Sequence, residues 1–285
     1  METLKNKIDF AVIVCVNNAN PNGDPLNGNR PRVNFDGLGE LSDVCLKRKI
    51  RNRLMEAGHS VFVQSDDNRV DDYRSLRSRA EGVLKSTDMK DEKKYREAAC
   101  KQWIDVRTFG QLFAFKGGGD DAGVSIGIRG PVSIHPAFSV APVLDRISSI
   151  QITKSVSGEG DGTKRASDTM GMKHRVDHGV YVFYGSMNPQ LATKTGFSDD
   201  DAEAIKEVLI KLFQNDASSA RPEGSMEVYK VYWWKHNNSN GQYSSAKVHR
   251  LLDVKPNNDQ PRRIDDYTIT LNELPDLGCE VMDGE

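Results

Sequence analysis

A nearly continuous run of β-branched and aliphatic residues, from Ile8 to Val16, constrains the fold of this chain more than any other feature. Such a run, without alternating polar residues, is typical of a strand that is covered on both faces. It is far shorter than the roughly 20 residues that a membrane helix requires. Asp9 interrupts the run and no small-residue cleavage pattern follows it, which argues against a signal peptide. We therefore expect a central strand that anchors a sheet.

Composition limits the possible partners of the chain. Its 285 residues suggest about two domains, or one domain with large insertions. The 39 Lys and Arg residues nearly balance the 41 Asp and Glu residues, so any anion binding requires local basic patches. Four scattered cysteines without a CxxC motif fit a reducing cytosol and provide no zinc site. We expect a cytoplasmic protein that needs no metal, no cofactor and no membrane.

Local patterns predict an α+β chain. Ser42 and Ser198 precede the patterns of capped helices. Helices are expected at residues 43–57, 71–85, 88–104 and from 198 onward, and strands at residues 124–134, 147–156, 180–184, 228–234 and 264–271. Glycine-rich, polar residues 157–178 indicate a hairpin that protrudes from the sheet. Two strand-helix-strand passages favour a ferredoxin-like, or RRM-like, core.

Residues 17–32 and the helix expected at 43–57 carry the strongest chemical signal. Residues 17–32 are too rich in Asn, Gly and Pro for regular structure and predict a long functional loop. The helix carries five cations within seven residues: Lys47, Arg48, Lys49, Arg51 and Arg53. Such cations repel one another unless solvent or phosphates neutralise them, so they indicate a solvated face or a nucleic-acid site. Arg30 and Arg32 in the loop favour the nucleic-acid site.

Four motifs lack the context that their chemistry requires. Residues 123–127 match G-x-S-x-G, but Gly130-Pro131 cannot readily begin the helix of a nucleophile elbow. Residues 18–29 have EF-hand spacing with neutral amides, and residues 158–164 lack the Gly-Lys-Thr order of a phosphate loop. His174 and His178 have i,i+4 spacing without a nearby cysteine. We expect no catalytic residue and no metal ligand.

Several stretches carry a specific family resemblance. They are NPNGDP at residues 20–25, NGNRPR at 27–32, SDVCLKRKIRN at 42–52, DVRTFG at 105–110, GPV at 130–132, TMGMKH at 169–174 and GVY at 179–181. In this order they resemble the crRNA-binding backbone subunit of type I CRISPR Cascade complexes, most closely the type I-C subtype, within the RAMP superfamily. The chain departs at Met172, where the resemblance implies Arg.

The resemblance implies an RRM-like (ferredoxin-like) palm, a helical fingers insertion and a protruding β-hairpin thumb. The palm would comprise residues 1–58, 123–154 and 179–285, the last with an acidic C-terminal tail, the fingers residues 59–122, and the thumb residues 155–178. Copies would stack head to tail into a helical filament along crRNA, with a neighbour's thumb displacing a base at regular intervals. The guide would then pair with target DNA in antiviral defence, alongside guide-processing, large and small Cascade subunits.

The resemblance also implies which residues contact RNA. Phosphate contacts would come from the helix residues Lys47, Arg48, Lys49 and Arg51, and backbone and ribose contacts from the loop residues Asn20, Asn22, Arg30 and Arg32. Thumb contacts would come from Lys164, Arg165, Lys173 and His174, with Met170 or Met172 as an apolar wedge between bases. Residues 265–285, which carry acids and no Lys or Arg, would meet basic surface on the next copy.

Two other functions stay open at this point. Backbone subunits of type III relatives cleave RNA with a loop Asp, for which Asp24, Asp36 and Asp43 are available. Magnesium-dependent cleavage of a guide-complementary RNA that is lost in Asp24→Ala would favour such a ribonuclease. A plain scaffold without nucleic acid predicts that Lys47→Glu with Arg51→Glu leaves assembly and nucleic-acid content unchanged.

Overall fold

The computed structural model describes residues 2–85, 87, 91–115, 124–154 and 169–285, which form a mixed α/β structure around a large antiparallel sheet. The strands are β1 (Ile8–Ala19), β2 (Gly23–Asp24), β3 (Arg30–Pro31), β4 (Leu38–Leu41), β5 (Gly110–Phe115), β6 (Val124–Arg129), β7 (Val132–Ile134), β8 (Ala137–Pro142), β9 (Ile147–Lys154), β10 (Thr169–Met187), β11 (Met226–Lys235), β12 (Leu252–Pro256), β13 (Tyr267–Leu271) and β14 (Glu280–Asp283). The helices are α1 (Asp43–Glu56), α2 (Leu76–Val83), α3 (Glu92–Gln102), α4 (Ile104–Phe109), α5 (Pro189–Thr195), α6 (Asp199–Ile210) and α7 (Ser245–His249). Among the helices in these ranges, none is long and apolar enough to cross a membrane.

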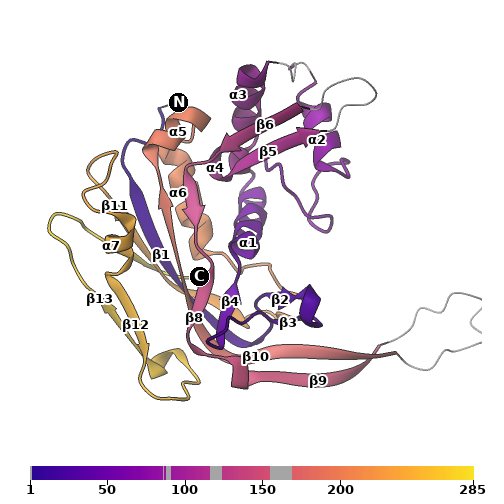
Figure 1. Ribbon diagram of the computed structural model, residues 1–285, viewed down its shortest axis with the longest axis vertical. Coiled ribbons are helices and arrows are strands. Elements are labelled where there is room, and N and C mark those ends of the chain that lie inside the picture. Colours follow the sequence, from indigo (N-terminus) through magenta and orange to yellow (C-terminus); the bar gives the residue numbers. More distant parts are fainter. Residues whose placement is uncertain (1, 86, 88–90, 116–123, 155–168) are drawn as a thin grey trace, which may run out of the picture.

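Strand β1 lies inside the main sheet, whose order is β14-β11-β1-β10-β8-β4 (Figure 1). It pairs antiparallel with β10 on one side and with β11 on the other. The opposite edge of β10 pairs in turn with β9, β8 and β7. The expectation of a central strand at residues 8–16 is confirmed, and the strand continues to Ala19.

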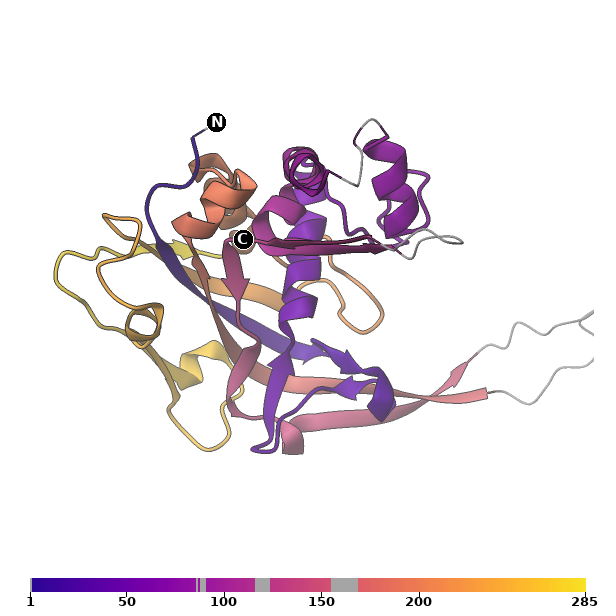
Figure 2. The same cartoon turned by 45° about the horizontal axis from the view of Figure 1, so that its top comes forward.

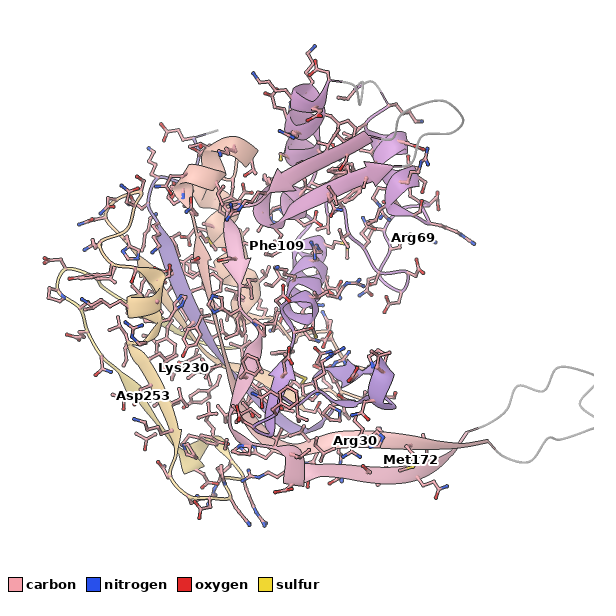
Figure 3. The ribbon with its side chains drawn as sticks, viewed as in Figure 1. Arg30, Arg69, Phe109, Met172, Lys230 and Asp253 are labelled. Carbon is pink, nitrogen blue, oxygen red and sulfur yellow. The ribbon has the colours of Figure 1, made fainter. Side chains whose placement is uncertain are left out.

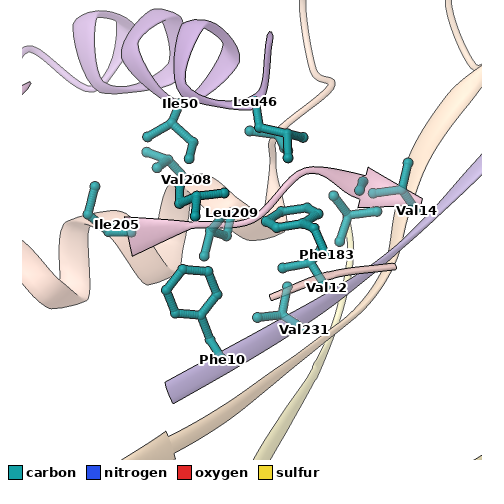
Figure 4. Packing of buried hydrophobic residues seen from close by; sticks show 14 of the residues in the cluster. Phe10, Val12, Val14, Leu46, Ile50, Phe183, Ile205, Val208, Leu209 and Val231 are labelled. Carbon is teal, nitrogen blue, oxygen red and sulfur yellow. The ribbon is translucent and has the colours of Figure 1, made fainter. Parts of the chain in front are cut away.

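The two faces of β1 supply two separate cores. Phe10, Val12 and Val14 pack with side chains of α1 and α6 on one face (Figure 4). Ala11 and Ile13 point to the other face, where α7 and the β12–β13 pair cover them. Since successive side chains of a strand alternate between faces, an unbroken apolar run requires a layer on each side.

Side-chain caps define where α1 and α6 begin. The hydroxyl of Ser42 accepts a hydrogen bond from the Cys45 amide (3.3 Å), and α1 ends before Gly58, which has a left-handed φ of 86°. Ser198 and Asp201 form a reciprocal capping box at the start of α6, with bonds of 3.1 and 3.0 Å. Both helix starts agree with the sequence prediction.

Residues 59–129 form a separate lobe with its own core. This lobe contains α2, α3, α4 and the β5–β6 hairpin, whose aromatic core includes Phe62, Trp103 and Phe113. The strand expected at residues 124–134 is divided by Gly130-Pro131 into β6 and β7. Because β6 pairs with β5, the lobe extends past the boundary expected at residue 122.

A hairpin of β9 and β10 extends from the sheet (Figures 1 and 2). Its strands pair from Ile147 opposite Val176 to Lys154 opposite Thr169. Strand β10 then continues without interruption through the sheet to Met187, so the boundary expected after residue 178 lies inside one strand. Lys164 and Arg165 lie outside the described residues.

Acids near the C-terminus form ion pairs within the chain. Strand β14 pairs with β11 at the edge of the sheet, where Asp283 contacts Lys230. Glu280 lies 3.1 Å from Lys206 on α6, and Glu285 lies 3.3 Å from Lys211. These contacts give Glu280, Asp283 and Glu285 basic partners in their own chain.

Replacement of Phe10 should test the core that β1 shares with α6. The Phe10 ring is fully buried and stacks on Trp233 with centroids 5.5 Å apart. We expect Phe10→Ala to lower the free energy of unfolding by about 3–5 kcal/mol, because it leaves a cavity. Phe35→Ala, which changes a fully exposed ring, should alter it by less than about 0.5 kcal/mol. Urea denaturation measures both, and equal losses would contradict this packing.

Candidate nucleic-acid interface

The lobe and the β9–β10 hairpin project to the same side of the molecule, with α1 between them (Figure 1). We call this side the α1 side. Figure 3 labels Arg69 on the loop between α1 and α2, and Arg30 and Met172 near the hairpin. Most of the residues expected to contact RNA lie on α1, on the loop before it or on this hairpin.

Carboxylates neutralise four of the five clustered cations of α1. Lys47 pairs with Asp43 at 2.9 Å and Arg51 with Asp105 at 2.8 Å, while Lys49 pairs with Asp216 and Arg53 with Glu56. These cations therefore need no phosphate to lie side by side, which corrects the expectation drawn from their density.

Lys49 and Arg51 each contact a carboxylate and an aromatic ring of the fold. The Lys49 side chain is only 4% exposed, and its burial lowers the pKa of the ammonium group despite the Asp216 carboxylate. Its Nζ lies 5.3 Å from the centre of the Phe213 ring, and the Arg51 guanidinium lies 5.2 Å from that of Phe109. Lys49 is not accessible to a phosphate in this fold.

Asp105 connects the lobe to α1. Its carboxylate is 1% exposed and accepts hydrogen bonds from the amides of Phe62 (2.7 Å) and Val63 (3.1 Å) and from Arg51 Nε (2.8 Å). A second connection joins Arg107 on α4 to Asp201 on α6 through bonds of 2.9 and 2.7 Å. Such charge-assisted, two-bond contacts fix orientation, so α1 and α6 position the lobe.

Three arginines on α1 and the following loop form no direct ion pair with a carboxylate of the described residues. Arg48 is exposed and, among the described residues, has no hydrogen bond or ion pair. Arg69, which is half-buried, and the exposed Arg74 likewise form no hydrogen bond or ion pair in the described part of the chain, and the sequence analysis did not single them out. In the sequence they are marked only by their basic side chains, within a charged stretch whose pattern resembles that of a helix. All three arginines carry positive charge on the α1 side without a direct carboxylate contact, although Arg48 interacts at longer range with Asp67 and Arg69 with Asp71.

The amides of the loop expected to contact RNA are used inside the chain. Asn22 Oδ1 accepts hydrogen bonds from the amide and the hydroxyl of Ser42, both at 2.9 Å. Asn20 is 3% exposed and donates to the Asn29 carbonyl at 2.7 Å. Both side chains therefore anchor the loop to itself and to the start of α1.

A hydrogen-bonded chain joins the loop to the hairpin. Arg30 Nη1 donates to Ser149 Oγ at 3.3 Å, and this hydroxyl lies 2.7 Å from His174 Nδ1. Burial, followed by the Arg30 charge, lowers the pKa of His174. The fold thus brings together two residues that the sequence placed in separate segments.

The remaining hairpin residues lie along β10. Met172 is 54% exposed and shares a face of the strand with His174, while Lys173 is half-buried on the other face. Met170 pairs through its backbone with Thr153. Met172 is therefore an apolar side chain that this part of the hairpin presents to solvent, as is Ile150 on β9, which is 46% exposed.

Acids of the loop have structural roles. Asp24 Oδ1 accepts a hydrogen bond from the Leu26 amide at 3.2 Å and lies 3.5 Å from Arg32 Nη2. Asp43 pairs with Lys47, and Asp36 lies on an exposed turn. No group of three or more His, Cys, Asp or Glu side chains in the described ranges is placed to hold a metal. His174 and His178 lie four residues apart on a strand, roughly 13 Å, which is too far for one ion.

A comparison with protein families decides the family of the chain. The model described as "CRISPR-associated protein Cas7" matches residues 6–272. The chain belongs to the Cas7 family. This Cas7 match includes β1, the lobe, the hairpin and most of the sheet.

Individual Cas7-like proteins are more distant. A protein of Haloferax volcanii named "CRISPR-associated protein Cas7" is 25% identical over 285 residues, covering 95% of this chain and 82% of its own length. A solved chain titled "CRISPR RNA-guided surveillance complex, pre-nicking" has 16% identity and a TM-score of 0.48, covering 84% of this chain and 82% of its own length. One titled "CRISPR RNA-guided surveillance complex" has 16% identity and a TM-score of 0.41, covering 80% and 68%.

The same substitution at two positions of α1 should separate structural from free cations. Arg51→Ala leaves the buried Asp105 carboxylate without its cation, so we expect the free energy of unfolding to fall by about 3 kcal/mol. Arg48→Ala removes an exposed, unpaired side chain and should change it by less than about 0.5 kcal/mol. Urea denaturation of the two variants tests this, and a larger loss in Arg48→Ala would refute the assignment.

Acidification should destabilise the fold through His178. Its Nδ1 lies 2.7 Å from Asn17 Oδ1 and its Nε2 is buried, and burial, followed by the Arg146 charge, lowers its pKa despite the opposing Asp266 charge. In the unfolded chain His178 has its ordinary pKa of 6.5, so it binds a proton more readily there than in the folded protein. The free energy of unfolding therefore falls as the pH decreases from 6.5 through the lowered pKa of the folded state. We expect the melting temperature to fall in this range and His178→Gln to reduce its pH dependence. The partly exposed His59, changed to Gln, is the control; an unaltered pH profile in His178→Gln would exclude this contribution.

Proposed function

We propose that this Cas7 family member is a non-catalytic RNA-binding subunit that forms the backbone of a type I-C Cascade complex along crRNA. The observation that carries the proposal is the set of arginines on the α1 side that form no direct ion pair in the described part of the chain, Arg48, Arg69 and Arg74, in a chain whose net charge is only -2. A nearly neutral protein binds a polyanion through such a local patch. Family membership supports the same function.

Each part of the fold receives a role in this proposal. The main sheet with α1 and α6 serves as the RRM-like palm, the lobe at residues 59–129 as the fingers, and the β9–β10 hairpin as the thumb. The palm grips the guide from the α1 side. The thumb of one copy reaches the RNA held by the next, since head-to-tail contacts between identical chains generate open helical filaments.

Contacts with RNA come mainly from the accessible cations. Arg48, Arg69 and Arg74 bind phosphates, and Arg30 does so where the loop meets the hairpin. Lys47 retains a part in phosphate binding because its pair with Asp43 is half-exposed and therefore weak. Arg32, Lys173 and His174 line the path toward the hairpin, Met172 enters the base stack, and Lys164, Arg165 and Met170 act in the thumb.

Sequence specificity in this proposal belongs to the guide. The protein reads the charge and shape of the RNA, and base pairing between guide and target DNA selects the sequence. The partners are further copies of this chain together with guide-processing, large and small subunits, in the cytoplasm. Asp24 has a structural part in the turn, which favours this function over metal-dependent RNA cleavage.

Charge reversal on α1 should weaken RNA binding without affecting the fold. We expect Arg48→Glu to raise the Kd for single-stranded RNA roughly tenfold and to reduce the slope of log K against log salt by about one. Lys194→Glu, an identical change of charge on the exposed end of α5, is the matched control and should have little effect. Fluorescence anisotropy at several salt concentrations measures both, and equal losses of affinity would refute a localised interface.

Purification from cells tests the whole proposal. The chain is expressed with its neighbouring genes and a CRISPR array, the bound nucleic acid is sequenced, and the mass is measured by light scattering. Uniform small RNAs with repeat-derived ends in a high-mass assembly are the expected result. A monomer free of nucleic acid would overturn the proposal.

A further inference from the structure

The β2–β3 turn presents an apolar side chain to solvent. Leu26 is 98% exposed, and it lies in the short 3-10 turn Pro25–Asn27. This turn projects to the α1 side, beside the hairpin (Figures 1 and 2). We infer that Leu26 is a wedge that inserts between bases of the single-stranded RNA bound on the α1 side, an inference that rests on the proposed function.

The turn holds Leu26 in a fixed position. Its amide donates to Asp24 Oδ1 at 3.2 Å, and the Asn29 amide donates to the Asp24 carbonyl at 2.8 Å. Asn20 holds the Asn29 carbonyl, and Asn22 holds the start of α1. Because the backbone that carries Leu26 is already ordered, insertion of the side chain requires little reordering of the main chain.

The surroundings of Leu26 indicate a nucleic acid rather than a protein as its partner. Arg30 lies on strand β3, which follows the turn, and Arg32 comes directly after that strand; Arg30 also reaches toward the hairpin through Ser149. An apolar tip beside cations complements a chain that has apolar base faces and a phosphate backbone. Phe35, which is equally exposed, lies on a different turn beside Asp36, three residues after Arg32.

The wedge belongs to the loop and not to the hairpin. Met172 is presented by β10 of the hairpin, whereas Leu26 is carried by the segment that leads from β1 into α1. Two apolar side chains from different elements therefore border the same path. Aliphatic wedges separate bases at little cost in single strands, where stacking is weak and no pairing is broken.

A fluorescent base reports on the wedge directly. The probe is a series of single-stranded RNA oligonucleotides, each with one 2-aminopurine at a different position, whose fluorescence rises when the base loses its stacking neighbours. With the full chain we expect a rise at particular positions. Leu26→Ser should abolish the rise at some of them, while Leu26→Met preserves it. Affinity should change by less than about tenfold, because phosphate contacts supply most of the binding free energy.

Control measurements distinguish failure of the wedge from failure of the proposed function. Phe35→Ser removes an equally exposed apolar side chain and should leave the fluorescence unchanged. Unchanged fluorescence in Leu26→Ser, with RNA still bound by anisotropy, would overturn the wedge and leave the proposed function intact. If Leu26→Ser instead reduced the mass of the RNA-bound assembly and left the fluorescence unchanged, Leu26 would make a protein contact, and the wedge would again be overturned. Failure of the unmodified chain to bind any of the oligonucleotides would overturn both.

Discussion

Strand β1 has neither a free edge nor a free face, and the rest of the structure depends on this. Its two edges pair with β10 and β11, and its alternate side chains supply two cores, so the chain must provide a covering layer on each side. The same pairing also aims the hairpin. Because Ala19 at the end of β1 pairs with Val176, the part of β10 before Val176 passes beyond β1 and, within the described residues, forms its strand pairing with β9 alone. The strand that anchors the core thereby fixes the direction of the element proposed to reach the next copy.

The clustered cations of α1 show why local charge is an ambiguous signal. The density of Lys and Arg in the sequence was sufficient to predict a basic helix, but not to predict which charges face solvent. Lys49 meets Asp216 from 167 residues away, and Arg51 meets Asp105 from 54 residues away. A buried cation requires such a carboxylate, whereas an exposed one such as Arg48 does not. Pairing over long sequence distances therefore divides one continuous motif into a structural part and an accessible part.

Elements that local chemistry determines were predicted well, and elements that distant pairing determines were not. The helix starts at Ser42 and Ser198 follow from caps within four residues. The assignment of β6 to the lobe depends on its pairing with β5, and no local pattern encodes that pairing. The same limit applies to the candidate site: Arg30 and His174 were both identified, yet their connection through Ser149 was not. Arg69 and Arg74 were missed because charged residues in a loop have no periodicity.

The composition of residues 17–32 has a physical explanation that differs from flexibility. Gly28 and Asn29 both have left-handed φ values, 58° and 59°, which Gly and Asn adopt most readily. A Cβ atom at Gly23 would lie 2.0 Å from Asn29 Oδ1, so this position tolerates only glycine without rearrangement. Asn20 and Asn22 then use their amides to hold the backbone. A segment rich in Asn, Gly and Pro is thus held as a defined turn partly by its own amides. What remains accessible to a partner includes Leu26 and the outer part of Arg30, together with exposed asparagines such as Asn18 and Asn27.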